Sequence, residues 1–283
     1  MEEANRTDWF MFGLAAALAL FGTMMVYSAS AMFALKETES ASQYTYFYKQ
    51  VAFTICGLLG MFILSRVDYH LFQKPWLVYS LLGITVVLLV LVFNFPAING
   101  AQRWIRFSGF SFQPSELAKV ALPIFLAYYL TKKEDLVGDF RQTVLPCLLG
   151  LGLLGGLVFL EKDLGTIVVL CAIFSTVYFA AGAKLSHLAG AAGVMLLIGA
   201  GAIYFAPWRV ARIMAFLDPY QYADDEGYQV VQSLYAIGSG GLLGEGFAQG
   251  HQKLFYLPYP YSDFIFSVIG EEFGLVGTLA VVT

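Results

Sequence analysis

Long apolar segments, separated mostly by short polar ones, dominate the sequence. A helix that crosses the hydrocarbon core of a bilayer needs about 20 residues. Eight segments approach or exceed that length: Trp9–Leu35, Tyr46–Leu64, Pro75–Phe95, Pro114–Leu130, Thr143–Leu160, Leu164–Ala183, His187–Ala206 and Asp263–Thr283. The pattern therefore predicts an all-α polytopic membrane protein with about eight transmembrane helices in a single domain over residues 1–283.

Two connections are longer than the rest, residues 94–113 and residues 207–262. Long loops in compact proteins often carry function, so we expect 207–262 to be a large functional loop between the seventh and eighth helices. Its five glycines between Gly238 and Gly246 permit turns and close backbone approach to a ligand, which suggests a flexible re-entrant segment. The chain ends on Val-Val-Thr without a polar stop, so we expect the complete fold to continue further.

The composition supports a membrane protein and excludes several other classes. Apolar residues make up 59% and charged residues 13%, and the mean hydropathy is +0.70. Soluble domains carry about 25% charged residues, so this chain cannot be a soluble secreted enzyme or a disordered protein. The net charge is −4 and no basic tract is present, which excludes a nucleic-acid partner. The cysteines and histidines lack the spacing of a disulfide framework or a zinc site.

Two pairs of arginines in the long connections are spaced three residues apart, Arg103 with Arg106 and Arg209 with Arg212. If those segments are helical, each pair lies on one face. The distribution of Lys and Arg does not decide the orientation of the chain. The two long connections follow the third and seventh segments, so both pairs are expected on the same side of the membrane. They indicate either an anionic ligand on that side or ordinary interfacial side chains.

Charged residues within or beside the apolar segments are candidate functional residues, because they are costly in a bilayer. Glu116 and Lys119 open the fourth segment and are spaced to form an ion pair. That pair is either a structural contact or a charged group that lines a polar cavity. Asp163 follows Glu161 and Lys162 with almost no loop, and it is placed to cap the next helix or to line a water-filled recess.

The last apolar segment carries three acidic residues. Asp263 is placed to cap its start, and Glu271 and Glu272 lie about 12 Å deeper at 1.5 Å per residue. We expect the two glutamates to form hydrogen bonds within the bundle, as structural contacts or as part of a functional cavity.

Several short motifs, taken together and in order, resemble the SEDS family of bacterial cell-wall polymerases (FtsW/RodA/SpoVE). They are Asn-Gly-Ala-Gln-Arg-Trp-Ile at 99–105, Phe-Gln-Pro-Ser-Glu-Leu-Ala-Lys at 112–119, Asp-Leu-Gly-Thr at 163–166, Gly-Tyr-Gln at 227–229, Gln-Ser-Leu at 232–234, Ala-Ile-Gly-Ser-Gly-Gly at 236–241, Lys-Leu-Phe-Tyr-Leu-Pro at 253–258 and Asp-Phe-Ile-Phe at 263–266. The resemblance covers about residues 9–283. The stretch from 227 to 241 looks more like the division member, FtsW, than the elongation member, RodA.

The resemblance implies a fold of ten transmembrane helices, of which this chain would lack the last two, and an extracytoplasmic loop at 207–262. It also implies a peptidoglycan glycosyltransferase that polymerises lipid II into glycan strands at the outer face of the bacterial cytoplasmic membrane, at the division septum. The implied partners are lipid II, the nascent glycan strand, a class B penicillin-binding protein with one transmembrane span, and other membrane proteins of the divisome.

The resemblance assigns roles to individual residues. The catalytic aspartate proposed for the family falls on Asp263, its Glu/Lys pair on Glu116 and Lys119, and its cavity aspartate on Asp163. One departure concerns this site. The family commonly has Pro-Glu-x-His-Thr-Asp before Phe-Ile-Phe, and here Tyr259 and Tyr261 replace the glutamate and histidine.

The implied reaction suits these residue types. A carboxylate can accept the proton of the attacking sugar hydroxyl, and the pyrophosphate leaving group needs cationic stabilisation. The candidate donors are Arg103, Arg106, Arg209, Arg212 and Lys253. We expect no tightly bound cofactor, although a divalent cation, Mg or Mn, could assist.

Two other functions remain open. A lipid II flippase would also need buried charges and a polar path, and the missing glutamate and histidine suit a non-catalytic scaffold that activates a penicillin-binding protein.

Overall fold

The computed structural model describes residues 8–37, 42–98, 100–107 and 110–283. Asn99, the first residue of one family-like motif, lies outside the described residues. The chain divides into two compact units, one formed by Asp68–Gly201 and the other by Met1–Val67 together with Ala202–Thr283. Each unit is described by itself below.

Each of the eight predicted segments forms a helix. The helices are α1 (Trp9–Glu37), α2 (Thr45–Leu64), α3 (Pro75–Leu91), α4 (Pro114–Lys132), α5 (Leu145–Leu160), α6 (Leu164–Ala180), α7 (Leu185–Tyr204) and α10 (Ile265–Val282). Six of the described helical segments are long and apolar enough to cross a membrane. The exceptions among the eight are α6, which has 17 residues, and α4, which carries Glu116, Lys119 and Lys132. The prediction of an all-α polytopic membrane protein is confirmed.

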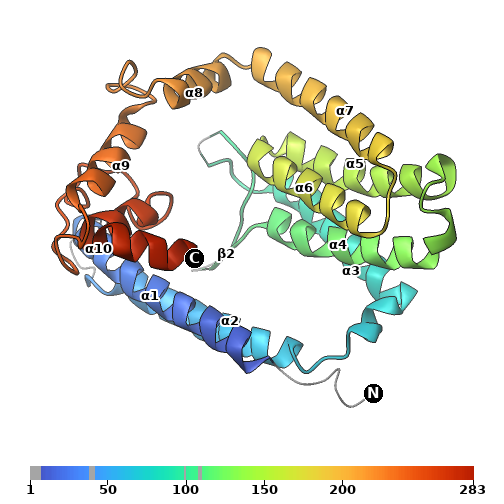
Figure 1. The fold of residues 1–283 in the computed structure, drawn as a ribbon, viewed down its shortest axis with the longest axis horizontal. Coiled ribbons are helices and arrows are strands. Elements are labelled where there is room, and N and C mark those ends of the chain that lie inside the picture. The colour runs from blue at the N-terminus through green and yellow to red at the C-terminus, as the bar shows by residue number, and fades with distance from the viewer. Residues whose placement is uncertain (1–7, 38–41, 99, 108–109) are drawn as a thin grey trace. The chain divides into compact units, whose positions relative to one another are not determined.

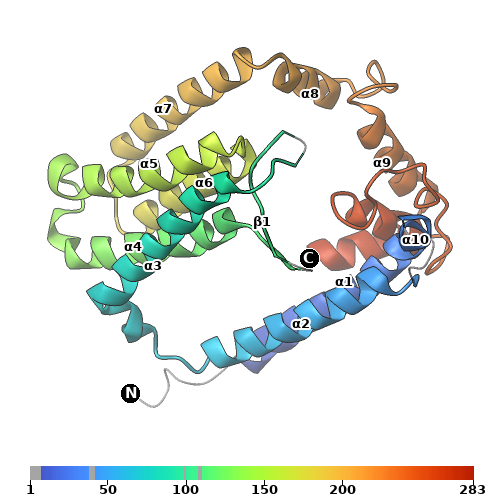
Figure 2. The same ribbon diagram turned by 180° about the vertical axis from the view of Figure 1, so that it is seen from behind.

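In the unit of residues 68–201, helices α3, α4, α5 and α6 pack side by side (Figures 1 and 2). Their shared core contains the buried side chains of Leu122, Leu126, Leu154, Leu170 and Phe174. Proline occupies the first turn of α3, α4 and α5, where its missing N–H breaks no helical hydrogen bond. Short helical turns accompany this bundle: η2 (Tyr69–Gln73), η3 (Val92–Asn94), η4 (Glu134–Leu136) and the π-helical η5 (Phe140–Val144).

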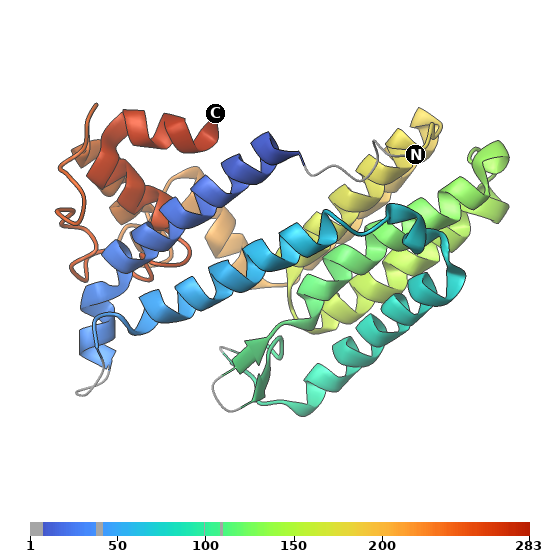
Figure 3. The ribbon, with the colours of Figure 1, turned by 90° about the horizontal axis from the view of Figure 1, so that it is seen from below.

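A two-stranded hairpin precedes α4 in the same unit (Figure 3). Strand β1 (Ile105–Phe107) pairs antiparallel with β2 (Phe110–Phe112), and Arg106 lies opposite Ser111. Residue 103 stands before the strand in irregular structure. Arg103 and Arg106 therefore do not share a helical face, because the segment that carries them is not helical.

In the other unit, α1 and α2 run side by side, and α10 packs against α1 (Figure 3). Met25 and Ala29 of α1 form a small core with Leu257, Val268 and Ile269. The long connection is largely structured, since it contains α8 (Pro207–Leu217) and α9 (Tyr228–Ser239), and α9 also packs against α10.

The glycine-rich segment is packed against α10 through its backbone. A Cβ atom on Gly240 would overlap the carbonyl of Gly270, and one on Gly244 would overlap the carbonyl of Glu272. Helix α10 is interrupted at Gly274, whose φ is 62° and ψ is −158°. There, the N–H of Leu275 donates to the carbonyl of Gly241. These glycines permit close approach to protein backbone, so this segment is packed on α10 rather than free; its re-entrant position in the membrane stays a prediction.

Candidate functional site

A tight turn between α5 and α6 brings two carboxyl groups to the end of the helical bundle. Helix α5 ends at Leu160, and Lys162 adopts a left-handed conformation with a φ of 63°. The N–H of Lys162 donates to the carbonyl of Phe159 at 2.9 Å, and that of Asp163 donates to the carbonyl of Val158 at 3.3 Å. This pair of hydrogen bonds closes the helix and reverses the chain within two residues.

Asp163 caps α6, as the sequence predicts. Its carboxylate accepts hydrogen bonds from the backbone N–H of Thr166 at 3.1 Å and from the hydroxyl of Thr166 at 3.0 Å. The same carboxylate accepts from Nε2 of Gln113 at 3.2 Å and lies 3.9 Å from Nη1 of Arg103. Asp163 is therefore both a helix cap and the centre of a small polar network.

Arg103 ties the segment before β1 to this turn. Its Nε donates to the carbonyl of Glu161 at 3.3 Å, and its Nη2 donates to the carbonyl of Lys162 at 2.6 Å. Lys162 also joins the turn to this segment, since its Nζ donates a hydrogen bond to the carbonyl of Gly100 at 3.0 Å. We call this group the Arg103–Asp163 cluster; its members are Arg103, Gln113, Glu161, Asp163 and Thr166.

Glu161 is the member of the cluster whose role sequence reasoning missed. Its side chain is fully buried, and neither carboxyl oxygen has a hydrogen-bond partner among the described residues. Burial, and secondarily the negative charge of Asp163, raise the pKa of the Glu161 carboxyl to about 8, although Arg103 acts in the opposite direction. The signal in the sequence is the run of three charges between two apolar segments with no loop around it.

Glu116 and Lys119 form the predicted ion pair, with 2.6 Å between Oε2 and Nζ. The pair is not buried within the chain, because the two side chains are 55% and 29% exposed. Lys119 also lines an open apolar groove between α4 and α6, together with Pro123, Val169 and Ile173. The pair therefore places a charged group at one point of a groove that is otherwise apolar.

Glu271 and Glu272 form the predicted hydrogen bonds within their own unit. Glu272 accepts from the Ser28 hydroxyl at 2.6 Å, from the Ala248 N–H at 3.0 Å and from Nζ of Lys253. Glu271 accepts from the N–H of His251 at 2.6 Å and from that of Gln252 at 3.0 Å. We call these residues the Glu271–Glu272 cluster; its members are Ser28, Lys253, Glu271 and Glu272.

Lys253 differs in its surroundings from the other candidate phosphate donors. It is 5% exposed, and its ammonium donates to both Ser28 and Glu272. A buried carboxylate therefore already neutralises its charge. Arg106, in contrast, is exposed and forms no side-chain hydrogen bond or ion pair within the described chain.

Asp263 is exposed, and its side chain makes no hydrogen bond or ion pair with a described residue. Helix α10 begins at Ile265, Phe264 occupies the N-cap position, and no side chain caps the helix. The expectation that Asp263 caps this helix is therefore wrong, because the turn continues for one residue beyond it. Asp263 is a carboxylate that has no structural hydrogen bond to maintain.

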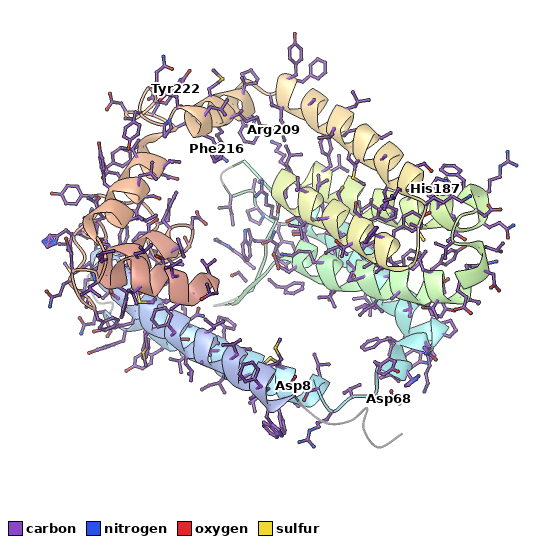
Figure 4. The ribbon with its side chains drawn as sticks, in the orientation of Figure 1. Asp8, Asp68, His187, Arg209, Phe216 and Tyr222 are labelled. Atoms are coloured by element: carbon purple, nitrogen blue, oxygen red, sulfur yellow. The ribbon has the colours of Figure 1, made fainter. Side chains whose placement is uncertain are left out.

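Helix α8 confirms the face predicted for the second arginine pair. The guanidinium groups of Arg209 and Arg212 both lie over the Trp208 ring, at 4.8 and 5.4 Å from its centroid. Arg209 also donates from Nη1 to the carbonyl of Ala202 at 2.7 Å, near the end of α7 (Figure 4). On the same helix Phe216 is largely exposed and Trp208 is half exposed, so α8 combines cationic and aromatic surface.

The predicted site residues fall in both units, and each group is described within its own unit. Arg103, Arg106, Glu116, Lys119 and Asp163 belong to residues 68–201, whereas Arg209, Arg212, Lys253 and Asp263 belong to the other unit. Within the described residues, no group of three or more His, Cys, Asp or Glu side chains could hold a metal ion. The structure thus brings Arg103 and Asp163 together and joins Glu116 to Lys119.

Comparison with known proteins identifies the family. A family model described as "Cell cycle protein" (FtsW/RodA/SpoVE) matches residues 8–283. The chain is 40% identical to a Geobacter sp. protein named "Probable peptidoglycan glycosyltransferase FtsW", over 99% of this chain and 76% of that protein. It is also 37% identical to stage V sporulation protein E of Bacillus subtilis, over 92% and 71% of the two chains.

Solved structures give the same result. The rod shape determining protein RodA of Thermus thermophilus is 27% identical, with a TM-score of 0.60 over 97% of this chain and 70% of that one. A chain from a structure titled "Structural coordination of polymerization and crosslinking by a peptidoglycan synthase complex" is 27% identical, with a TM-score of 0.70 over 97% and 74%. The protein is therefore a multi-pass membrane protein that belongs to the FtsW/RodA/SpoVE family.

Proposed function

We propose that the protein is a peptidoglycan glycosyltransferase that polymerises lipid II into glycan strands at the outer face of the bacterial cytoplasmic membrane. The observation that carries this function is the 40% identity, over 99% of the chain, to a relative named as such an enzyme. That relative and others carry the name FtsW, which supports a role at the division septum.

Asp263 is the proposed general base. The 4-hydroxyl of the acceptor sugar attacks C1 of the donor, its proton passes to the carboxylate, and the bond from C1 to the lipid pyrophosphate breaks. An exposed carboxylate without a hydrogen bond of its own can approach the hydroxyl without first breaking a structural contact. Glu271 and Glu272 are less suitable, because each already accepts hydrogen bonds from backbone N–H groups of the loop.

Arginines are the proposed ligands of the pyrophosphate. Arg106 is exposed and unpaired within the described chain, and Arg212 is held over Trp208 with no competing carboxylate. Arg103 and Arg209 use part of their donor capacity on backbone carbonyls, so they would contribute their remaining N–H groups and their charge. Lys253 is the weakest candidate, because Glu272 already neutralises it.

A divalent cation, Mg or Mn, is a further proposed participant. The described residues offer no preformed set of three ligands, but Mg²⁺ commonly binds one or two carboxylates together with substrate phosphates. Asp263 is the carboxylate that fits this arrangement, since no other group occupies it. The cation would supply positive charge to the pyrophosphate when bound.

The apolar groove between α4 and α6 is the proposed site of a substrate lipid tail. Its lining residues Pro123, Val169 and Ile173 suit a hydrocarbon chain, and the ion pair of Lys119 with Glu116 provides a polar contact beside them. An amphiphile with a polar head and an apolar tail matches both features.

A class B penicillin-binding protein and other divisome membrane proteins are the proposed partners, with lipid II and the nascent strand as substrates. The TM-score of 0.70 to a chain of a peptidoglycan synthase complex supports a partner that crosslinks the strands.

The alternative function, a non-catalytic scaffold, depends on the replacement of the family's glutamate and histidine by Tyr259 and Tyr261. Tyr261 packs on the rings of Phe33 and Tyr46, which is a structural role and leaves Asp263 exposed.

The test is an assay of the purified chain in liposomes with lipid II, with and without a class B penicillin-binding protein. We expect glycan strands in a reaction that needs lipid II at the outer face. Translocation of lipid II without polymer under every partner and metal condition would establish the flippase instead. Absence of both activities, with the penicillin-binding protein still stimulated, would establish the scaffold.

Arg106→Gln tests the binding role separately from folding. Because the exposed Arg106 side chain makes no hydrogen bond or ion pair within the described chain, we expect lipid II affinity to fall while thermal stability stays unchanged. Lys132→Gln, which removes an exposed cation at the far end of α4, is the matched control. Equal affinity in the two variants would make Arg106 an interfacial side chain only.

A further inference from the structure

The backbone carbonyl of Glu161 is hydrogen-bonded, whereas its side-chain carboxyl group has no hydrogen-bond partner among the described residues. Its backbone carbonyl accepts a hydrogen bond from Nε of Arg103 at 3.3 Å. Its carboxyl group is fully buried, and both oxygens lack a hydrogen-bond partner within the described part of the chain. An ionised carboxylate in such a place is very unfavourable unless a cation or several donors compensate it.

The nearby donors are already committed to other acceptors. Arg103 uses Nε and Nη2 on the carbonyls of Glu161 and Lys162, and its Nη1 faces Asp163 at 3.9 Å. The ammonium of Lys162 donates to the carbonyl of Gly100. A negative charge on Glu161 would therefore have to draw Arg103 away from its carbonyls or repel Asp163, two residues further along.

We propose that Glu161 is a positioning residue that acts as a neutral carboxylic acid, and that its protonation keeps Arg103 bound to the turn and directed at Asp163. Loss of this proton would draw Arg103 away from the two carbonyls that it binds, and would thereby displace the N–H groups that it has left for the anionic substrate. The consequence for catalysis rests on the proposed function; the protonation itself does not.

The charged groups around Glu161 set the direction of its response to pH. Asp163 is a like charge and disfavours ionisation, whereas Arg103 favours it. Burial outweighs the effect of Arg103, so the pKa of the Glu161 carboxyl is raised to about 8. The proton would therefore be held at neutral pH and lost in mildly alkaline solution.

Infrared spectroscopy of the intact chain tests the protonation without any assay of activity. A protonated carboxylic acid has a C=O stretching band that a carboxylate lacks. We expect Glu161→Gln to remove one such band at pH 7, and we expect Glu134→Gln, a change of an exposed glutamate in the same unit, to remove none. Identical spectra of the wild type and Glu161→Gln in this band would overturn the proposal.

The pH profile of polymerisation tests the positioning role. Above about pH 8 we expect the wild-type rate to fall about tenfold for each pH unit, as for the loss of one essential proton. Glu161→Gln, which is permanently neutral and nearly isosteric, should keep wild-type activity at pH 7 and lack this decline. Glu134→Gln should retain the decline.

Two results would contradict the positioning role. One is an alkaline decline that is the same in Glu161→Gln and the wild type. The other is an inactive Glu161→Gln of normal stability, which would mean that an ionised carboxylate is needed. If the wild type makes no polymer at any pH, the proposed function fails, but the infrared result still decides whether Glu161 is protonated.

Discussion

Glu272 and Glu161 are both fully buried glutamates, yet only the carboxyl group of Glu272 has hydrogen-bond partners among the described residues. Glu272 accepts hydrogen bonds from Ser28, Ala248 and Lys253, so an opposite charge and two further donors compensate its carboxylate. Glu161 has no partner for either oxygen among the described residues. Burial alone does not distinguish a structural carboxyl from a functional one; the number of donors around it does.

The Glu271–Glu272 cluster fastens a loop to a helix. The Glu271 carboxylate accepts hydrogen bonds from two backbone N–H groups. The backbone carbonyls of Glu271 and Glu272 accept hydrogen bonds from the N–H groups of Glu245 and Gly246, respectively. These bonds hold the segment after the glycine-rich stretch against the first half of α10. In the Arg103–Asp163 cluster, Arg103 instead donates to two backbone carbonyls and faces the carboxylate of Asp163. The first arrangement compensates both carboxylates, whereas the second leaves the carboxyl group of Glu161 without a hydrogen-bond partner among the described residues.

The largest effect on stability should come from breaking the compensated pair. Lys253→Ala leaves the Glu272 carboxylate buried without its cation, which costs about 3–5 kcal/mol in comparable buried pairs. Denaturation in detergent micelles measures the loss. The double variant Lys253→Met with Glu272→Gln removes both charges and should recover most of it. A single variant as stable as the wild type would show that water reaches this cluster.

Glu161 should produce a pH-dependent loss of stability. Its pKa is about 8 in the folded chain and 4.5 as the ordinary value, so the folded state holds a proton that the unfolded chain releases in this range. The contribution of Glu161 to the free energy of unfolding should therefore be fully present below about pH 4.5 and should fall by a few kcal/mol up to about pH 8. Unfolding measured against pH should show this slope in the wild type and a smaller one in Glu161→Gln. Parallel slopes would contradict the account.

The cap of α6 should contribute less. Asp163→Ala removes the acceptor for the Thr166 N–H and hydroxyl, and loss of an N-cap typically costs about 0.5–2 kcal/mol. Asp163→Asn keeps a capping oxygen, so its stability should lie close to that of the wild type while its charge toward Arg103 is lost. Melting temperatures of the two variants separate these contributions. Equal losses in both would mean that charge, rather than capping, stabilises the turn.

The smallest effect should come from Glu116→Ala. The sequence suggests a costly buried pair, but both side chains are partly exposed, and such pairs are worth about 0.2–1 kcal/mol. The unfolding midpoint should therefore shift only slightly. A loss of several kcal/mol would show that the pair lies in low-dielectric surroundings, as a buried charge would.

The sequence predicts the helices well because their signal is local. The eight apolar segments, the cap at Asp163 and the ion pair between Glu116 and Lys119 all depend on residues close in the chain. The hairpin around Arg106 was not predicted, because the charged spacing in this segment also suits a helix. The cap expected at Asp263 was wrong because a turn displaces the start of α10 to Ile265.

The remaining features depend on contacts between distant segments. Lys253 looks like a free cation in the sequence, but Glu272, from α10, neutralises it. The glycine-rich segment resembles a ligand loop, but its glycines allow it to pack on the backbone of the same helix. Glu161 lies two residues before Asp163, which the sequence identifies, and what distinguishes it is a buried carboxyl group without a hydrogen-bond partner among the described residues. Pairwise contacts of this kind leave no periodic pattern in a single sequence.

One measurement tests the central distinction most directly: the polymerisation rate per folded molecule of Asp263→Asn beside that of the double variant Lys253→Met with Glu272→Gln. The Asp263 side chain is exposed and makes no hydrogen bond or ion pair with a described residue, so the asparagine variant should fold normally. It should polymerise about 10²–10⁴-fold more slowly, the usual contribution of a positioned base. The double variant should keep near-normal activity per folded molecule. Normal polymerisation by Asp263→Asn, with activity lost in a well-folded double variant, would contradict the account and place the chemistry at Glu272.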